Sequence, residues 1–384
     1  MRRVILAAPE AWCAPTWRAS RIRRYLEWLS QDGGGTFIGP MGSEGPCLLP
    51  GIVHEDPIQD FALPSSEVAP KIAELLKEKC FGTTPLVIHA LGIEAGLGGL
   101  MGRRGKNRVI IEPGVREVHI LKDRFAIQSE TAAEGTQITG GLDGVRARLA
   151  ALDALEEHAL KRADAVIASS TVEAAHLAQI VQDPGRLVLA PFGVSCPAGI
   201  QDADLPRIAV YVGQHGGQAL DFFYRLAERL KENWRAVLVY NTPDSQVVRA
   251  TRIPERFHGR IDWCEVGDGL DFRLAGCQIV LCARPMGRML LSGALNPDEV
   301  NWGLSRALPL IAPDFDVIRA SAGPAAAYYP PSDADECAAI VDTVLANRGE
   351  RQRLAQASLA QAKQLTWDAA AAAMSDCWRI LQLD

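Results

Sequence analysis

Two ionisable side chains stand at the ends of apolar runs that read as buried strands. His89 falls at the end of the run LVIHA, and Glu112 ends the run RVIIE. The carboxyl ends of strands in parallel α/β sheets are where ligand-binding residues gather. A histidine there could bind a hydroxyl or carry a proton, and a buried glutamate is costly without a purpose. We take His89 and Glu112 as candidate catalytic residues; the alternatives are a satisfied structural histidine and a helix cap or salt bridge from Glu112 to Arg116.

Two arginines and a glycine-rich segment offer groups that bind phosphate. Arg284 and Arg288 follow a predicted buried strand, and guanidinium forks bind phosphate in bidentate fashion. Gly213, Gly216 and Gly217 precede a predicted helix, whose first N–H groups and dipole favour an anion. The alternatives are ordinary surface arginines and glycines that serve a tight turn.

Other chemistries lack the residues they need. No DxD-type carboxylate pair follows a strand, and the nine cysteines contain no CxxC pair, so we expect no metal and no bound cofactor. There is no GxSxG motif, and AAPEAWCAP after the first strand contains no glycine for a dinucleotide fingerprint. The formal net charge of -6 argues against a nucleic-acid partner.

The elements that would position these residues alternate between strand and helix. Strands are predicted over residues 3–8, 36–39, 85–90, 108–112, 165–168, 186–191, 207–212, 235–240, 259–264, 278–282 and 309–312. Helices are predicted over residues 16–30, 66–79, 94–103, 142–161, 171–180, 218–232, 297–306, 333–346, 350–364 and 367–381. Continuous β-branched runs are typical of parallel strands buried on both faces.

This alternation predicts an α/β chain with two doubly wound, Rossmann-like domains. The polar segment 193–206 reads as a linker, so the domains are residues 1–195 and residues 206–365. Residues 115–141 are weakly periodic and read as a partly irregular connection. Ligand would bind in a central cleft between the domains, at the carboxyl ends of the strands.

Four segments together resemble the GT-B glycosyltransferases of family 4, the group 1 glycosyltransferases. EEHALKRADAVIASSTVEAAHL followed by RLVLAPFGV is similar to a family strand-to-helix junction and a strand ending in PxGV; its first residue, Glu156, reads as structural. YVGQHGGQALDFFYRLAERL stands where the family begins its second domain with a VGR…KG loop. PDEVNWGLSRALPLIA is similar to PNKxxEyLAxGxPVIA, and TWDAAAAAMSDCWRIL is similar to the last family helix. The resemblance extends from Glu156 to the C-terminus; before it, only the fold pattern agrees.

The resemblance implies a GT-B fold whose last helix, residues 366–382, packs back onto the first domain. It implies transfer of a sugar from a nucleotide sugar, usually with retention, to a glycan, lipid-linked or protein acceptor. The expected setting is bacterial polysaccharide biosynthesis or glycosylation in the cytoplasm. Trp17, Arg21 and Trp28 leave peripheral contact with the inner face of the cell membrane open, as an alternative to surface and core packing. No apolar run is long enough for a transmembrane helix.

The chain departs from the family pattern at the donor-binding positions. Trp302 replaces the glutamate that contacts the donor ribose, and an indole has one donor and no acceptor. Trp302 could instead stack on a base or sugar, while Glu299, one turn earlier, could partly replace the carboxylate. Gln214 and Gln218 stand where the family has an arginine and a lysine. The alternative function is therefore a non-catalytic GT-B protein that acts as a partner or scaffold in a glycosylation or polysaccharide system.

Overall fold

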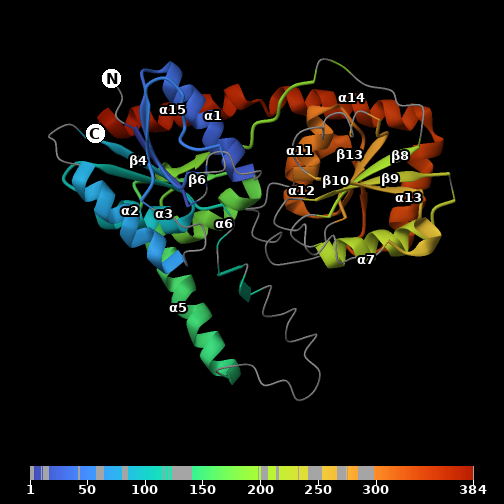
Figure 1. Ribbon diagram of the computed structural model, residues 1–384, viewed down its shortest axis with the longest axis horizontal. Coiled ribbons are helices and arrows are strands. Elements are labelled where there is room, and N and C mark those ends of the chain that lie inside the picture. The colour runs from blue at the N-terminus through green and yellow to red at the C-terminus, as the bar shows by residue number, and fades with distance from the viewer. Residues whose placement is uncertain are drawn as a thin grey trace. The chain divides into compact units, whose positions relative to one another are not determined.

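The computed structural model divides the chain into two compact units (Figure 1). The described part of unit 1 falls within Met1–Pro191 and Asp368–Asp384, and that of unit 2 within Phe192–Met286 and Asn296–Trp367. The structure describes residues 4–9, 11, 17–41, 44–57, 65–79, 85–114, 116, 118–119, 121–122, 141–197, 199, 206–212, 216–231, 233–240, 253–265, 274, 276–283 and 298–383.

Unit 1 contains a seven-stranded parallel sheet in the order β3-β2-β1-β4-β5-β6-β7. Its strands are β1 (Val4–Ala7), β2 (Gly35–Ile38), β3 (Ile52–Glu55), β4 (Val87–Leu91), β5 (Arg108–Glu112), β6 (Ala165–Ala168) and β7 (Leu187–Leu189). Its helices are α1 (Trp17–Gln31), α2 (Ser65–Lys79), α3 (Ile93–Gly102), α5 (Gly141–Arg162), α6 (Thr171–Val181) and α15 (Trp367–Leu383), with a 3-10 turn η1 (Pro184–Arg186).

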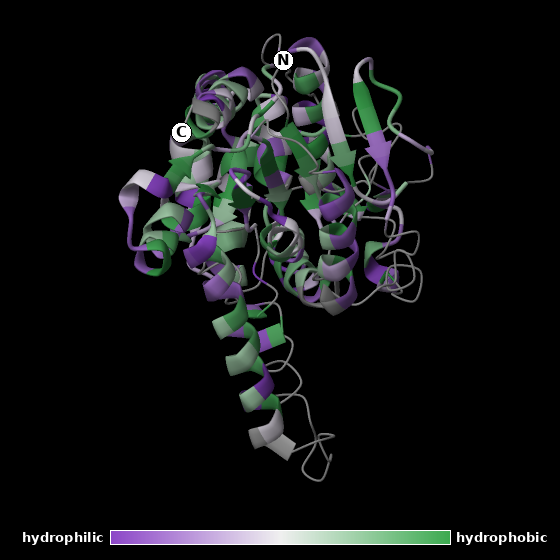
Figure 2. Cartoon of the chain, turned by 90° about the vertical axis from the view of Figure 1, so that its left-hand side faces the viewer, coloured by the Kyte–Doolittle hydropathy of each residue, from purple (hydrophilic) through white to green (hydrophobic). Residues whose placement is uncertain are grey.

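The two faces of this sheet bury separate clusters of apolar side chains. Leu6, Val87 and Ile110 pack with α1 and α15 on one face, whereas Ile5, Ile88 and Ile111 pack with α2, α3, α5 and α6 on the other. Figure 2 shows hydrophobic strands lying between helices whose residues alternate in hydropathy. Successive side chains of a strand point to opposite faces of the sheet, so the position of a residue along its strand decides which helices it packs against.

Unit 2 contains a six-stranded parallel sheet in the order β10-β9-β8-β11-β12-β13. Its strands are β8 (Arg207–Tyr211), β9 (Arg235–Tyr240), β10 (Ile261–Glu265), β11 (Ile279–Leu281), β12 (Leu310–Pro313) and β13 (Ala326–Tyr329). Its helices are α7 (Gly216–Ala227), α11 (Asp298–Ser305), α12 (Asp316–Ala322), α13 (Ala334–Ala346) and α14 (Arg348–Gln364), with 3-10 turns η3 (Glu255–Phe257) and η4 (Gly323–Ala325). The predicted fold class of two Rossmann-like parallel sheets with helices is confirmed.

Local capping explains where several helices begin. The Ser170 hydroxyl accepts the Glu173 N–H at the start of α6, and the Asp333 carboxylate accepts the N–H groups of Asp335 and Glu336 at the start of α13. Such caps satisfy donors that have no partner inside the helix. The sequence identified the cap of α6 but missed β3, α12 and β13.

Candidate functional site

The unit 2 sheet reverses its strand order between β8 and β11, which lie side by side. Val210 of β8 is paired with Leu281 of β11, and β9 continues on one side while β12 continues on the other. In open parallel sheets, ligands bind at the carboxyl ends of the strands beside such a reversal. The end of β8 at Tyr211 and the end of β11 at Leu281 therefore mark the candidate donor site of this unit.

Helix α11 packs Trp302 against this point. The Trp302 and Tyr211 rings meet edge to face, with centroids 5.0 Å apart and an interplanar angle of 87°. Tyr211 is buried and Trp302 is half-buried. Gly303 permits this close packing, since a Cβ there would lie 2.2 Å from Leu310 Cδ2 of β12. The indole thus lies beside the carboxyl end of β8, where a planar ring can stack on a ligand.

Glu299 is more deeply buried than its predicted contact with the donor ribose requires. It has no exposed surface, although the preceding residue begins α11. Burial raises the pKa of Tyr329 well above its ordinary value, with Cys337, Cys282 and Glu299 contributing in the same direction. The Tyr329 hydroxyl donates to the Cys282 carbonyl at 2.7 Å, just after β11. Glu299 thus belongs to the buried end of the site, and a contact with ribose stays a prediction.

The predicted phosphate-binding side chains fall outside the described residues. These are Gln214, Arg284 and Arg288, together with Gly213. Gly216 and Gly217 are described as the first two residues of α7. A helix that begins after β8 presents backbone N–H groups at the carboxyl edge of the sheet. A phosphate-binding role for these residues stays a prediction.

In unit 1, His89 and Glu112 belong to one buried network. His89 is the central residue of β4, and Glu112 is the last residue of β5. His89 has no exposed surface and Glu112 is 4% exposed, so both are enclosed between the sheet, α1 and α15. The Trp378 indole of α15 donates to His89 Nδ1 at 3.3 Å, and His89 Nε2 lies 3.5 Å from Glu112 Oε2. Since an indole only donates, the His89 proton lies on Nε2, toward Glu112.

The Glu112 carboxylate is held mainly by helix α1. Arg21 Nε lies 2.5 Å from Glu112 Oε1, and the Tyr25 hydroxyl donates to Oε2 at 3.3 Å. Burial alone would raise the pKa of Glu112, but the Arg21 guanidinium and the His89 ring outweigh it and lower that pKa. Burial lowers the pKa of His89, although Glu112 opposes this shift. The network therefore contains an ionised glutamate, a charged arginine and a neutral histidine.

Solved structures match this chain over nearly its full length. No family model and no curated protein sequence matches it. Sucrose-phosphate synthase (tll1590) from Thermosynechococcus elongatus has a TM-score of 0.73 at 15% identity, covering 99% of each chain. Anabaena HepE (Alr3699), in complex with UDP-glucose, has a TM-score of 0.65 at 12% identity, covering 97% of this chain and 98% of its own. The UDP-forming α,α-trehalose-phosphate synthase from Burkholderia vietnamiensis has a TM-score of 0.67 at 12% identity, covering 99% of each chain. The chain has the GT-B fold.

For this GT-B chain, the structure contradicts one predicted strand end and two alternatives that the sequence left open, a Glu112–Arg116 pair and a lipid contact of Arg21. His89 does not end its strand, because β4 continues through Leu91. Glu112 pairs with Arg21 rather than Arg116. Arg21 has no exposed surface and therefore does not meet a lipid headgroup. Trp28 is half-buried beside Trp378, with ring centroids 4.9 Å apart and planes tilted by 31°.

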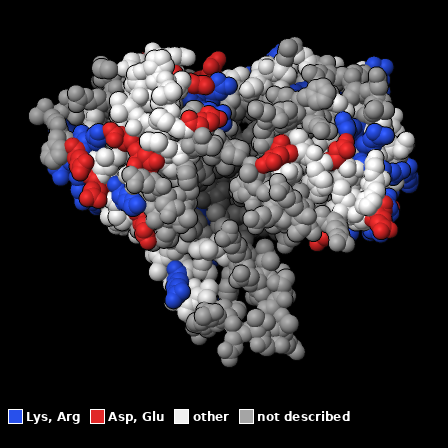
Figure 3. All heavy atoms as spheres, viewed as in Figure 1, with Lys and Arg blue, Asp and Glu red and all other residues white. Residues whose placement is uncertain are grey.

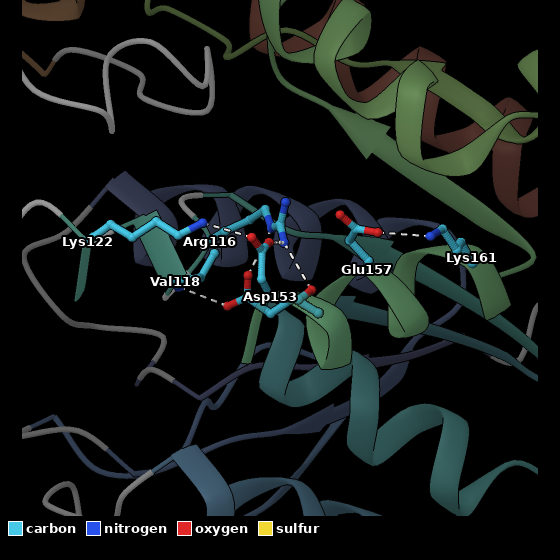
Figure 4. A network of polar contacts seen from close by, with 7 residues as sticks. Arg116, Val118, Lys122, Asp153, Glu157 and Lys161 are labelled. Carbon is cyan, nitrogen blue, oxygen red and sulfur yellow. Dashed lines mark hydrogen bonds and ion pairs between the residues drawn. The ribbon is translucent and has the colours of Figure 1, made fainter. Parts of the chain in front are cut away.

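Arg116 instead binds the acidic face of α5. Its Nε donates to Glu156 at 2.8 Å and its Nη2 contacts Asp153, which also accepts from Lys122 (Figure 4). The Val118 N–H donates to Glu156 as well, at 3.1 Å. The sequence-based interpretation of Glu156 as structural agrees with these contacts.

Glu173, which is not among the residues predicted from the sequence, lies in the first turn of α6 at the carboxyl end of β6. Its Oε2 accepts from the Ser169 N–H at 2.7 Å and from the Ser169 hydroxyl at 2.6 Å. Burial raises its pKa to about 7, against these two hydrogen bonds, which lower it. The Ser-x-x-Glu spacing of residues 170–173 is the capping-box signal that would have drawn attention to it.

The described ranges contain neither a metal-ligand cluster nor a membrane helix. Within them, no three His, Cys, Asp or Glu side chains gather as metal ligands would. No described helix has the length and apolar composition needed to cross a bilayer.

Proposed function

We propose that this GT-B chain is a glycosyltransferase that takes a sugar from a nucleotide sugar, with the donor nucleotide bound by unit 2. The observation that carries the proposal is Trp302, whose half-buried ring lies edge to face on Tyr211 at the carboxyl end of β8. Full-length similarity to structures described as UDP and UDP-glucose complexes supports a nucleotide of this kind. The acceptor would be a glycan, lipid-linked or protein group, and transfer would retain the anomeric configuration, as the family resemblance implies.

The proposed donor site divides its tasks among three parts of unit 2. Trp302 stacks on the base or sugar. An indole can take this role, although it has no acceptor for the ribose hydroxyls. The first N–H groups of α7, at Gly216 and Gly217, attract the diphosphate through the helix dipole. Arg284 and Arg288, which follow β11 in the sequence, supply the positive charge that stabilises the departing diphosphate.

His89 and Glu112 would support this chemistry as positioning residues. Neither side chain has the exposed surface that contact with a substrate requires. Their network connects α1, β4, β5 and α15, the elements that surround the reversal of strand order between β1 and β4. We propose that they fix these elements beneath an acceptor site in unit 1.

The first experiment tests whether the chain binds a nucleotide. Thermal-shift and calorimetric titrations of the full chain with UDP, GDP, ADP and their sugars are expected to identify one binding nucleotide. Binding should quench tryptophan fluorescence, and Trp302→Phe should reduce both the quenching and the affinity. Trp263→Phe is the matched control and should retain the affinity, since Trp263 of β10 is likewise half-buried and lies edge to face on a tyrosine, Tyr240. No binding by any nucleotide at millimolar concentration would contradict the proposal.

A non-catalytic GT-B protein is the second candidate, and the donor position itself favours it. Trp302 replaces a carboxylate that the family uses, and Glu299 is fully buried beside it. Such a protein would act as a partner in a glycosylation or polysaccharide system. It would bind no nucleotide, or would bind one without any release of free nucleotide when candidate acceptors are added. A transferase would release nucleotide in proportion to the sugar that it transfers.

A further inference from the structure

We propose that unit 1 contains a second anion site, which binds the phosphate groups of a small soluble molecule. A pocket of about 420 Å³ lies at the amino ends of β5, β6 and β7. Its charged lining is five cations and one carboxylate: Arg103, Arg108, Lys161, Arg162, Arg186 and Asp164. The candidate donor site lies at the carboxyl edge of the other sheet, so the two sites share no residue.

The floor of the pocket holds two guanidinium groups in fixed positions. Arg103 Nη1 lies 3.0 Å from Asp164 Oδ2, and Arg108 Nη1 lies 3.3 Å from Asp164 Oδ1. The carboxylate is itself fixed, because Oδ2 also accepts the Val109 N–H at 2.8 Å. One carboxylate between two guanidinium groups leaves a positive charge, and each arginine keeps further N–H donors beyond the one bound to Asp164.

Part of the remaining charge compensates the negative end of a helix. Arg186 donates to the carbonyls of Lys161 and Ala163, each at 2.9 Å, and so caps the last turn of α5. Lys161 pairs with Glu157 at 2.8 Å on the exposed face of α5 (Figure 4). Arg162 has no ion-pair partner among the residues described. Its charge is therefore not neutralised by a carboxylate, although, like Lys161, it lies in the last turn of α5, where a cation favours the helix end.

A phosphate group, which carries up to two negative charges, fits this arrangement better than a singly charged carboxylate or a neutral ligand does. The chain carries a net charge of -6, and on the face shown in Figure 3 acidic and basic side chains of described residues are interspersed. The pocket, in contrast, keeps an excess of positive charge, since its five cations face three carboxylates: Asp164 in the lining, Glu157 beside Lys161 and Asp183 beside Arg186. Guanidinium forks bind phosphate oxygens in bidentate fashion, and a volume of this size falls in the range of about 300–1,000 Å³ typical of small-molecule sites. Leu381 of α15 gives the pocket one apolar wall for the rest of the ligand.

Calorimetric titration of the full chain with pyrophosphate and with glucose 6-phosphate tests the site. We expect saturable binding that weakens as salt rises. Arg162→Ala and Arg108→Ala should each weaken it by roughly three- to tenfold. Asp164→Asn should strengthen binding, because it removes the competing negative charge but keeps an acceptor for the Val109 N–H. Arg24→Ala, which removes an exposed arginine paired with Glu27 on α1, is the matched control and should change nothing.

Two further titrations distinguish this pocket from the nucleotide site of unit 2 and from a lipid-binding surface. The double variant Arg284→Ala/Arg288→Ala, which removes the diphosphate contacts proposed for unit 2, should leave pyrophosphate binding intact. A loss in this variant, with none in Arg162→Ala and Arg108→Ala, would assign the anion to unit 2 and overturn the proposal. Vesicles of phosphatidylglycerol, compared with phosphatidylcholine, test a lipid source of the same phosphate chemistry. Binding to anionic vesicles alone, or unchanged affinity in both arginine variants, would equally overturn it. The outcome does not depend on whether unit 2 binds a nucleotide.

Discussion

At the scale of single residues, unit 1 is defined by ionisable groups that the fold encloses. The Glu112 carboxylate contacts the side chains of Arg21, Tyr25 and His89, so its charge is compensated inside the core. Arg21 also donates to the carbonyls of Ala190 and Pro191, at 2.9 and 3.3 Å. A buried ion pair adds little net stability, but removing one partner leaves an uncompensated charge.

Arg21→Ala is expected to lower the free energy of unfolding by about 3–5 kcal/mol, because Glu112 and two carbonyl groups lose their partner. Glu112 has a lowered pKa in the native protein, so the stability it contributes is present above its ordinary pKa and is lost as the pH falls. The difference between variant and wild type should therefore shrink toward pH 4. Urea unfolding at several pH values measures this difference. Arg24→Ala is the control, and an equally large loss there would contradict the assignment.

Glu173 should make stability fall as the pH rises through neutrality. Its pKa is raised to about 7, so its favourable contribution is present at low pH and is lost as the carboxyl ionises in the native protein. A shift of this size corresponds to about 3 kcal/mol at most. Glu173→Gln should therefore stabilise the protein at pH 8 more than at pH 5.5, which thermal unfolding at both pH values can measure. A variant with equal effects at both values would show that Glu173 does not titrate in this range.

At the scale of elements, local patterns predicted α11 well but not what it contacts. The helix was predicted over residues 297–306 and runs over Asp298–Ser305, since its periodicity is local. The contact between Trp302 and Tyr211 joins distant segments, and no spacing in the sequence encodes it. The burial of Glu299 likewise depends on contacts with distant segments, and no spacing in the sequence encodes it. β3 and β13 were missed because both are four-residue edge strands, and neither has the longer β-branched run of the central strands.

Gly303→Ala tests whether close packing of α11 positions Trp302. The added methyl group would lie 2.2 Å from Leu310 Cδ2, so α11 has to move away from β12. Such overpacking costs about 1–3 kcal/mol. We expect lower stability of unit 2 and weaker nucleotide binding, measured by thermal shift and by calorimetry. Gly276→Ala is the control, because its Cβ would meet only the Arg207 side chain at an ordinary 3.5 Å.

At the scale of the whole molecule, each unit has its own apolar core. Two clusters of buried side chains lie on the faces of the unit 1 sheet, and a third lies within unit 2. The described part of unit 1 ends at Pro191, whose carbonyl accepts from Arg21, and resumes in α15, whose Trp378 indole donates to His89. Segments far apart in the sequence thus complete the same core, which explains why Figure 1 shows α15 beside α1.

Separate cores predict that the two units melt in distinguishable transitions, which can be assigned by variants and by ligand. Arg21→Ala should lower the transition of unit 1 alone, and Gly303→Ala that of unit 2 alone. A nucleotide at a hundred times its dissociation constant stabilises the unit that binds it by about 2.7 kcal/mol. For a unit of this size, that free energy raises the midpoint by roughly 5–10 °C. Scanning calorimetry should show this rise in the transition that Gly303→Ala lowers, and none in the one that Arg21→Ala lowers. If both transitions shift together in every experiment, the units unfold as one cooperative body and the separate cores do not act independently.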